Sequence, residues 1–137
     1  MKRSKKSPYS EMILLYGIDR DGAQGRAIDA ICQEMKIPVK HLTEDDLDTN
    51  VGKLAEMSIL QESQTTQEET VPPLPAMILR GFTNRRIDEL LNNMRECDAG
   101  YIPLKAVITE VNRYWTLKLL LCNLAQERAQ LESRRAN

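Results

Sequence analysis

Residues 76–82 read Ala-Met-Ile-Leu-Arg-Gly-Phe and residues 12–18 read Met-Ile-Leu-Leu-Tyr-Gly-Ile, so one apolar run ending in glycine occurs twice, 64 positions apart. A second match follows at almost the same offset, because Ile-Pro-Val-Lys at 37–40 returns as Ile-Pro-Leu-Lys at 102–105. Two matches at nearly one offset indicate an internal duplication. The chain is therefore predicted to contain two copies of one unit.

Each unit is predicted to fold as a strand, a helix, a second strand and a second helix. A continuous apolar run is typical of a strand that is buried on both faces of a sheet. The helix after it has an apolar stripe at helical spacing, and the second strand is shorter and carries a lysine. These βαβα units occupy residues 11–57 and 76–133. The polar, proline-rich residues 58–75 are expected to form a flexible connector, and residues 1–10 a disordered basic tail.

The alternation of strands and helices predicts an α/β fold with right-handed crossovers. Continuously apolar strands belong in the middle of a sheet, and strands interrupted by lysine belong at its edges. The expected structure is one four-stranded, mainly parallel sheet of order 2-1-3-4 with helices on both faces, the first and third helices on opposite faces. In this arrangement the loops 19–25 and 83–86 meet at a switch point, where open α/β sheets bind ligands.

The composition favours a cytoplasmic globular protein and argues against several classes of partner. The chain of 137 residues is 42% hydrophobic and 28% charged, with a net charge of −1, so no overall field attracts nucleic acid or an anionic membrane. No apolar run approaches the roughly 20 residues that span a bilayer, and no secretory signal follows the basic N-terminus. Cys32, Cys97 and Cys122 lie far apart, which is typical of reduced thiols rather than of a zinc or redox site.

One candidate anion site lies before the first helix. Gly22 and Gly25 can present backbone N–H groups to an anion, with Arg26 beside them. The spacing matches neither a dinucleotide-binding nor a P-loop motif. A turn that needs the backbone freedom of glycine explains the same residues.

The main candidate surface combines the loop after the third strand with the loop after the fourth. Thr and Asn side chains can bind a ligand, but they also build turns by bonding their own backbone. The single Trp can stack on a ring or fill a gap beside a helix. Lys105 is a charge partner if its side chain points toward these loops. The candidate binding residues are Gly81, Thr83, Asn84, Lys105, Thr109, Asn112 and Trp115.

The second copy resembles an uncharacterised bacterial family that is known only as a domain of unknown function. The shared pattern is P-A-x-x-x-x-G-F, a helix, and then I-P-L-K-A-V-x-T-x-x-N-x-x-W-T, over about residues 75–127. The resemblance implies no activity. The positions that match are Pro75, Ala76, Gly81, Phe82, Pro103, Leu104, Lys105, Ala106, Val107, Thr109, Asn112, Trp115 and Thr116.

The sequence therefore favours a small non-enzymatic binding or regulatory module whose partner is a protein or a small anionic ligand. The alternative is a sensor or enzyme that binds a nucleotide or phosphorylated metabolite at the switch point. His41, the only histidine, has no nucleophile beside it in the sequence, so we assign no catalytic residue. We expect no metal and no cofactor.

Overall fold

The computed structural model describes residues 9–136, so the predicted basic tail lies almost wholly outside the described residues. Two βαβα units follow one another along the chain, as the sequence predicts. A short 3-10 turn follows each second strand, at Glu44–Asp46 and Asn112–Tyr114. The strands are β1 (Met12–Tyr16), β2 (Val39–Leu42), β3 (Ala76–Arg80) and β4 (Leu104–Val107), and the helices are α1 (Ala23–Met35), α2 (Val51–Leu54), α3 (Asn84–Glu96) and α4 (Leu117–Ala136).

The four strands form one mixed sheet in the predicted order β2-β1-β3-β4. The outer pairs, β1 with β2 and β3 with β4, are parallel, whereas the central pair of β1 and β3 is antiparallel. Leu14 lies opposite Ile78 in this central pair, and these are equivalent residues of the two copies. The two units are therefore related by an approximate two-fold axis that passes through the Leu14–Ile78 pair.

The antiparallel centre corrects two of the sequence-based expectations. A two-fold axis normal to the sheet places equivalent helices on the same face, so α1 and α3 pack together and do not cover opposite faces. The carboxyl ends of β1 and β3 lie at opposite ends of the sheet, so the loops 19–25 and 83–86 do not meet at a switch point. A fully apolar strand fits a parallel or an antiparallel neighbour equally well, which is why the pattern did not distinguish them.

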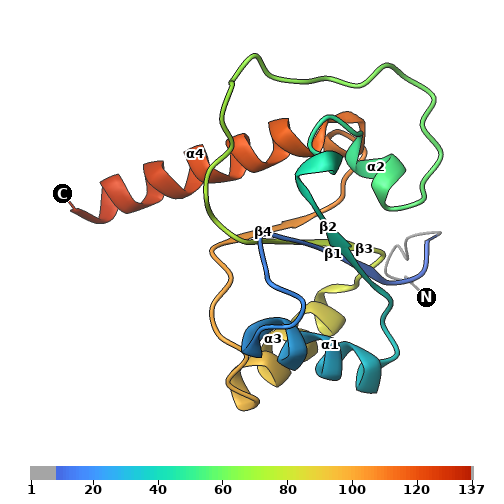
Figure 1. Ribbon diagram of the computed structural model, residues 1–137, viewed down its shortest axis with the longest axis vertical. Helices are drawn as coiled ribbons and strands as arrows, with labels where there is room; N and C mark the ends of the chain where they lie inside the picture. The colour runs from blue at the N-terminus through green and yellow to red at the C-terminus, as the bar shows by residue number, and fades with distance from the viewer. Residues whose placement is uncertain (1–8, 137) are drawn as a thin grey trace, which may run out of the picture.

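The hydrophobic core has two layers, one on each side of the sheet (Figure 1). Alternate residues of β1 enter different layers, so Leu14 packs toward α2 and α4 while Ile13 and Leu15 pack toward α1 and α3. All five residues of β1 and all five of β3 are buried. The sheet is thus covered on both faces, and its open sides are the edges along β2 and β4.

The two edge lysines point to opposite faces of the sheet even though the sequence aligns them. Lys40 pairs with Leu14, but the copy of Leu14, Ile78, pairs with Ala106. Each second strand is therefore displaced by one residue relative to the other, and a one-residue shift turns every side chain to the other face. Lys40 donates to the carbonyl of Leu54 on the α2 side, whereas Lys105 lies on the α3 side.

The connector, residues 58–75, runs outside the body and contacts the loop before α4. Gln64 donates its N–H to the carbonyl of Tyr114 at 2.8 Å and accepts the N–H of Thr116 at 2.8 Å. Further along, the carbonyl of Thr70 lies 3.9 Å from the Cys122 sulfur on α4. These contacts place the connector along the face that carries α4.

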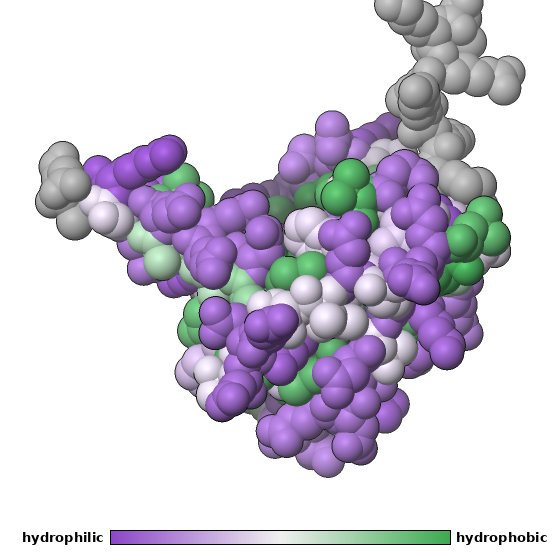
Figure 2. Space-filling model, turned by 90° about the horizontal axis from the view of Figure 1, so that it is seen from above, coloured by the Kyte–Doolittle hydropathy of each residue, from purple (hydrophilic) through white to green (hydrophobic). Residues whose placement is uncertain are grey.

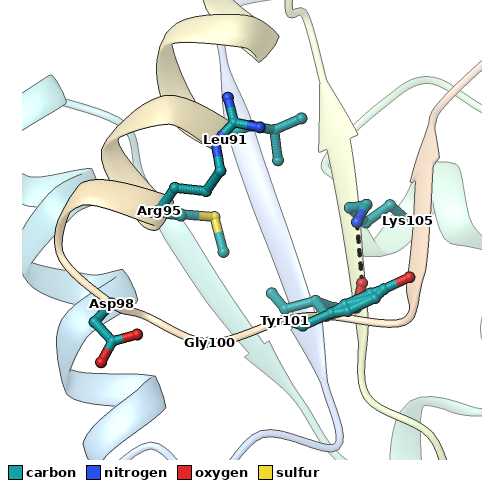
Figure 3. A pocket seen from close by; sticks show the side chains of 8 residues that line it. Leu91, Arg95, Asp98, Gly100, Tyr101 and Lys105 are labelled. Carbon is teal, nitrogen blue, oxygen red and sulfur yellow. Dashed lines mark hydrogen bonds between the residues drawn. The ribbon is translucent and has the colours of Figure 1, made fainter.

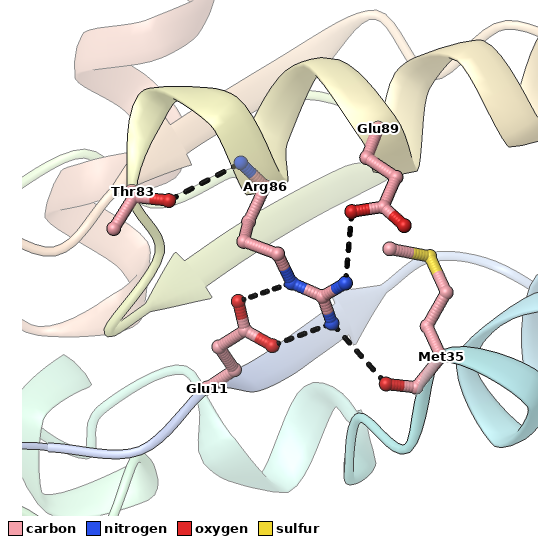
Figure 4. A network of polar contacts seen from close by, with 5 residues as sticks. All are labelled: Glu11, Met35, Thr83, Arg86 and Glu89. Atoms are coloured by element: carbon pink, nitrogen blue, oxygen red, sulfur yellow. Dashed lines mark hydrogen bonds and ion pairs between the residues drawn. The ribbon is translucent and has the colours of Figure 1, made fainter.

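A cluster of polar contacts around Arg86 ties three elements together on the other face (Figure 4). The guanidinium donates twice to the Glu11 carboxylate, at 2.8 Å each, and once to Glu89 at 2.9 Å. It also donates to the carbonyl of Met35 at the end of α1. The hydrogen bonds that Arg86 donates to Glu11, and after them the one to Glu89, raise the pKa of Arg86 above its ordinary value. The start of β1, the end of α1 and the first turn of α3 are held by one side chain.

Replacing this guanidinium should cost measurable stability. We expect Arg86→Met to lower the free energy of unfolding by about 1–2 kcal/mol, because a partly buried bidentate pair is stronger than an exposed one. Arg85→Met is the matched control, since Arg85 is exposed on the same turn and should change stability little. Urea denaturation followed by circular dichroism measures both, and equal effects would contradict the role given to Arg86.

Candidate functional site

The carboxyl-terminal half of the chain forms a groove along the open edge of β4. We call this surface the β4 groove; it consists of two hollows that share Tyr101 and Lys105, one on each face of the sheet. Tyr101 lies in the segment that leads into β4, separated from the strand by Ile102 and Pro103, and Lys105 lies within the strand. The groove thus follows the edge strand rather than the loops at the ends of the sheet.

The hollow on the α3 side has a volume of about 430 Å³ (Figure 3). The last turns of α3 supply Leu91 and Arg95, and Lys105 faces them from β4. Lys105 donates to the carbonyl of Ile102 at 3.2 Å, and its ammonium group lies 4.7 Å from the centre of the Tyr101 ring. Leu91, Met94 and Ile102 make much of this hollow apolar, and its charged side chains are Arg95, Lys105 and Asp98, two positive and one negative.

The hollow on the α4 side has a volume of about 300 Å³ and lies under the end of α4. Figure 2, which looks onto the face that carries α2 and α4, shows the last part of α4 standing out from the body of the molecule. Leu124, which packs against the core, and Arg128 and Leu131 further along α4 line the hollow. Arg128 also forms an ion pair with Glu132 at 3.1 Å.

Tyr101 separates the two hollows and is held by cations on both sides. The Arg128 guanidinium donates to the Tyr101 hydroxyl at 3.0 Å and lies 5.6 Å from the ring centre. Lys105 contacts the same ring from β4. Tyr101 is nevertheless 61% exposed, so its position is set while much of its surface remains in water.

Exposed apolar side chains gather around this strand. Among the described residues, five large hydrophobic side chains are exposed. Tyr101 and Leu131 line the β4 groove, and Val107 is the last residue of β4. Val111 follows in the next loop, and Leu60 lies in the connector. Single exposed hydrophobics are ordinary, but several around one edge strand indicate a contact surface.

The backbone of β4 is paired on one side only. Leu104 donates to the carbonyl of Pro75 and Ile108 donates to that of Leu79, so alternate residues of the strand bond to β3. Successive residues direct their backbone groups to opposite sides, so the N–H and C=O groups of Lys105 and Val107 point away from β3. The Val107 carbonyl accepts from the Asn112 amide at 3.0 Å. The N–H and C=O of Lys105 and the N–H of Val107 therefore face outward and make no hydrogen bond within the sheet.

The loops singled out from the sequence lie together at one end of the sheet, and Lys105 does not lie there. Because β3 and β4 are parallel, Gly81, Thr83 and Asn84 come at the same end as the loop 109–115. Thr83 caps α3 by accepting from the N–H of Arg86, and Asn84 is exposed. Lys105 sits toward the start of β4, facing α3.

Thr109 and Asn112 bond each other's backbone. Asn112 Oδ1 accepts from the N–H of Thr109 at 2.8 Å, and Thr109 Oγ1 accepts from the N–H of Asn112 at 3.1 Å. Thr43 and Asp46 form the same reciprocal cap after β2, at equivalent positions of the first copy. This pairing therefore belongs to the repeated unit, and it occupies the atoms that would otherwise contact a ligand.

The contacts of Trp115 and of Gly81 also give these two candidate residues a role in the fold. Trp115 packs against the core layer under α4, and its carbonyl accepts from the N–H of Val51. Gly81 has φ +77°, and a Cβ there would lie 2.5 Å from the carbonyl oxygens of Tyr9 and Ser10. Only glycine fits this close approach of the two segments.

At the alternative anion site, the chain itself supplies an anion. Gly22 caps α1 without a side-chain hydrogen bond, and Gly25 is buried against the backbone of Asp19, where a Cβ would lie 2.2 Å from the Asp19 oxygen. The Asp19 carboxylate accepts from the N–H of Asp21 beside this helix start. Arg26 is exposed. The two glycines are therefore explained by the tight turn before α1, in which the backbone passes too close to Asp19 for a side chain at Gly25.

His41 pairs with Asp29 across α1 and β2, with 3.0 Å between Nε2 and Oδ1. Cys32 follows one turn later on α1 and is fully buried. Burial, and after it the nearby Asp29 carboxylate, together raise the pKa of the Cys32 thiol to about 12. A protonated thiol is a poor nucleophile. No group of three or more His, Cys, Asp or Glu residues that suits a metal ion occurs in residues 9–136.

Comparison with known proteins identifies the second copy alone. Residues 75–131 match the family model DUF3783, a domain of unknown function, which confirms the resemblance expected for this half. The match includes β3, α3, β4 and most of α4, and therefore nearly the whole β4 groove. No curated protein and no solved structure matches the chain. No helix within the described part of the chain is long and apolar enough to cross a membrane.

The cap of the 109–112 turn should contribute to stability. Asn112→Ala removes the acceptor for Thr109 and the donor to Val107, and we expect it to lower the free energy of unfolding by about 1–2 kcal/mol. Asn84→Ala, an exposed amide at the same end of the sheet, is the control and should have little effect. Chemical denaturation measures both. An Asn112→Ala variant as stable as the parent would contradict a structural role.

Thiol reactivity tests the burial of Cys32. With an aromatic disulfide reagent at pH 8, Cys97 should react at once because it is exposed, whereas Cys32 and Cys122 should react only as the protein opens. At this pH a thiol of pKa about 12 is ionised in roughly one molecule in ten thousand. Cys97→Ser should abolish the fast phase. Rapid labelling of Cys32 in that variant would overturn the assignment.

Proposed function

We propose that this chain is a small cytoplasmic, non-enzymatic binding module that recognises another protein through the β4 groove. One observation carries the proposal: an edge strand with outward backbone groups is flanked on both faces by hollows and by exposed apolar side chains. Tyr and Arg are the residues that most often dominate the energy of protein interfaces, and Tyr101 and Arg128 stand at the centre of this surface. Binding here would be a way to regulate the partner.

The proposal assigns no reaction, cofactor or metal to the chain. His41 is engaged with Asp29, and the nearby Cys32 holds its proton, so this cluster is better suited to stabilising the contact of α1 with β2 than to catalysis. The near-neutral charge supports a protein partner over nucleic acid or a membrane surface.

A small anionic ligand, such as a nucleotide or phosphorylated metabolite, is the second candidate. The observation in its favour is that Gly22 leaves the first N–H groups of α1 without a side-chain cap. The carboxylates of Asp19 and Asp21 near this helix start would repel an added anion. We therefore rank it below the protein-binding proposal.

A peptide-display library tests the proposed function on the full chain. Clones enriched on the parent protein should lose about tenfold or more in affinity for Tyr101→Ala, the loss typical of a central aromatic contact. Leu60→Ala, which removes a more exposed apolar side chain from the connector, is the matched control and should bind normally. A library without enriched clones, or clones that bind Tyr101→Ala as well as the parent, would contradict the proposal.

A further inference from the structure

We propose that the partner binds as an extended segment that joins the sheet as a fifth strand beside β4, with acidic side chains on the α3 side and aliphatic ones on the α4 side. This inference rests on the proposed function and specifies the chemistry of the partner.

The outward backbone groups of β4 match what an added strand needs. The N–H and C=O of Lys105 and the N–H of Val107 point away from β3, two residues apart. An added strand pairs with such groups through its own alternate N–H and C=O groups, and this main-chain pairing supplies affinity without a fixed sequence. A helix or a globular face cannot satisfy them in this way.

The two hollows match the alternation of side chains along a strand. Successive side chains of an added strand point to opposite faces of the sheet. On one face they would enter the hollow beside Leu91 and Arg95, and on the other face the hollow beside Leu124 and Leu131. A hollow on each face of one edge is the arrangement that strand addition requires for specificity.

The charges decide which side chains enter each hollow. On the α3 side, Arg95 donates to the Asn92 amide and Lys105 to a backbone carbonyl, and neither forms an ion pair within the described residues. On the α4 side, Arg128 is already paired with Glu132, and Glu127 and Arg135 also line the hollow with opposite charges. The charges that α4 contributes to this side therefore balance, and Leu124 and Leu131 offer apolar surface between them. Carboxylates therefore fit the α3 side better, even though Asp98 also lines it, and aliphatic side chains fit the α4 side.

The other edge of the sheet and a second copy of the chain fit less well. On β2, Lys40 and His41 are half-buried and bound to the Leu54 carbonyl and to Asp29. Lys105 on β4 is exposed, although it too donates to a backbone carbonyl. Pairing of two β4 edges would bring two copies of Lys105 close together, and lysine on an edge strand opposes such pairing. An acidic partner removes that repulsion.

Designed peptides test the inference with defined probes. The first is acetyl-Val-Glu-Val-Glu-Val-Glu-Val-amide, whose Glu and Val side chains separate onto opposite faces when it is extended. The second replaces each Glu with Lys. Two further peptides carry N-methyl groups on all Val or on all Glu residues, which removes the N–H groups of one side of the strand only. Binding to the full chain is measured by shifts in the ¹⁵N–¹H spectrum, up to about 1 mM peptide.

We expect the Val/Glu peptide to shift the amide signals of Lys105 and Val107, and the Val/Lys peptide to bind about tenfold more weakly or not at all. One N-methylated peptide should lose about tenfold in affinity while the other binds like the parent, because only one set of N–H groups faces β4. Lys105→Glu should reverse the preference between Glu and Lys peptides. Arg85→Glu makes the same change of charge outside the groove, and it should leave the preference for the Glu peptide unchanged.

Three results would overturn strand addition by an acidic segment. The first is no binding of the Val/Glu peptide, and the second is equal tolerance of both N-methylated peptides. The third is a dimer in sedimentation of the protein alone that Val107→Asp dissociates, which makes a second copy the occupant. If display clones still depend on Tyr101 in these cases, the binding module stands and only the mode of binding fails. If they do not, both proposals fail.

Discussion

The antiparallel pairing of β1 with β3 is the contact on which the rest of the structure depends. It places the two copies around an axis through Leu14 and Ile78, and it buries both strands completely. Because the copies are related in this way, α1 and α3 share one face and the second helices share the other. The same pairing sends β2 and β4 to the outside, so a duplication that fills the centre of the sheet leaves two edges open.

The two edges differ because the copies have diverged around a common frame. A one-residue displacement turns Lys40 toward α2, where it is bound, and Lys105 toward α3, where it lines a hollow. The last helix is much longer in the second copy, and its projecting end forms the other side of the groove. The reciprocal cap of Thr43 with Asp46 and of Thr109 with Asn112 shows what both copies have kept. The groove is therefore a property of the second copy.

The sequence was sufficient for the elements and their order, because apolar runs and repeated Ile-Pro-x-Lys segments are local signals. It could not settle the direction of β3 relative to β1, since both strands are apolar throughout. The candidate loops were found from the types of their residues, but Thr109 and Asn112 prove to bond one another. Arg95, Tyr101 and Arg128 were missed, and Arg128 lies 27 residues after Tyr101, so that only the course of α4 past β4 brings the two together.

Hydrogen exchange of the free protein tests most directly whether the edge of β4 is open. The amides of Leu104 and Ile108, which donate to β3, should exchange as slowly as the hydrogen-bonded amides of the central strands. Those of Lys105 and Val107 should exchange close to the rate of an unstructured chain, because they face outward. Protection of Lys105 and Val107 equal to that of their neighbours would mean that the edge is already covered, and would contradict the account of the β4 groove as a binding surface.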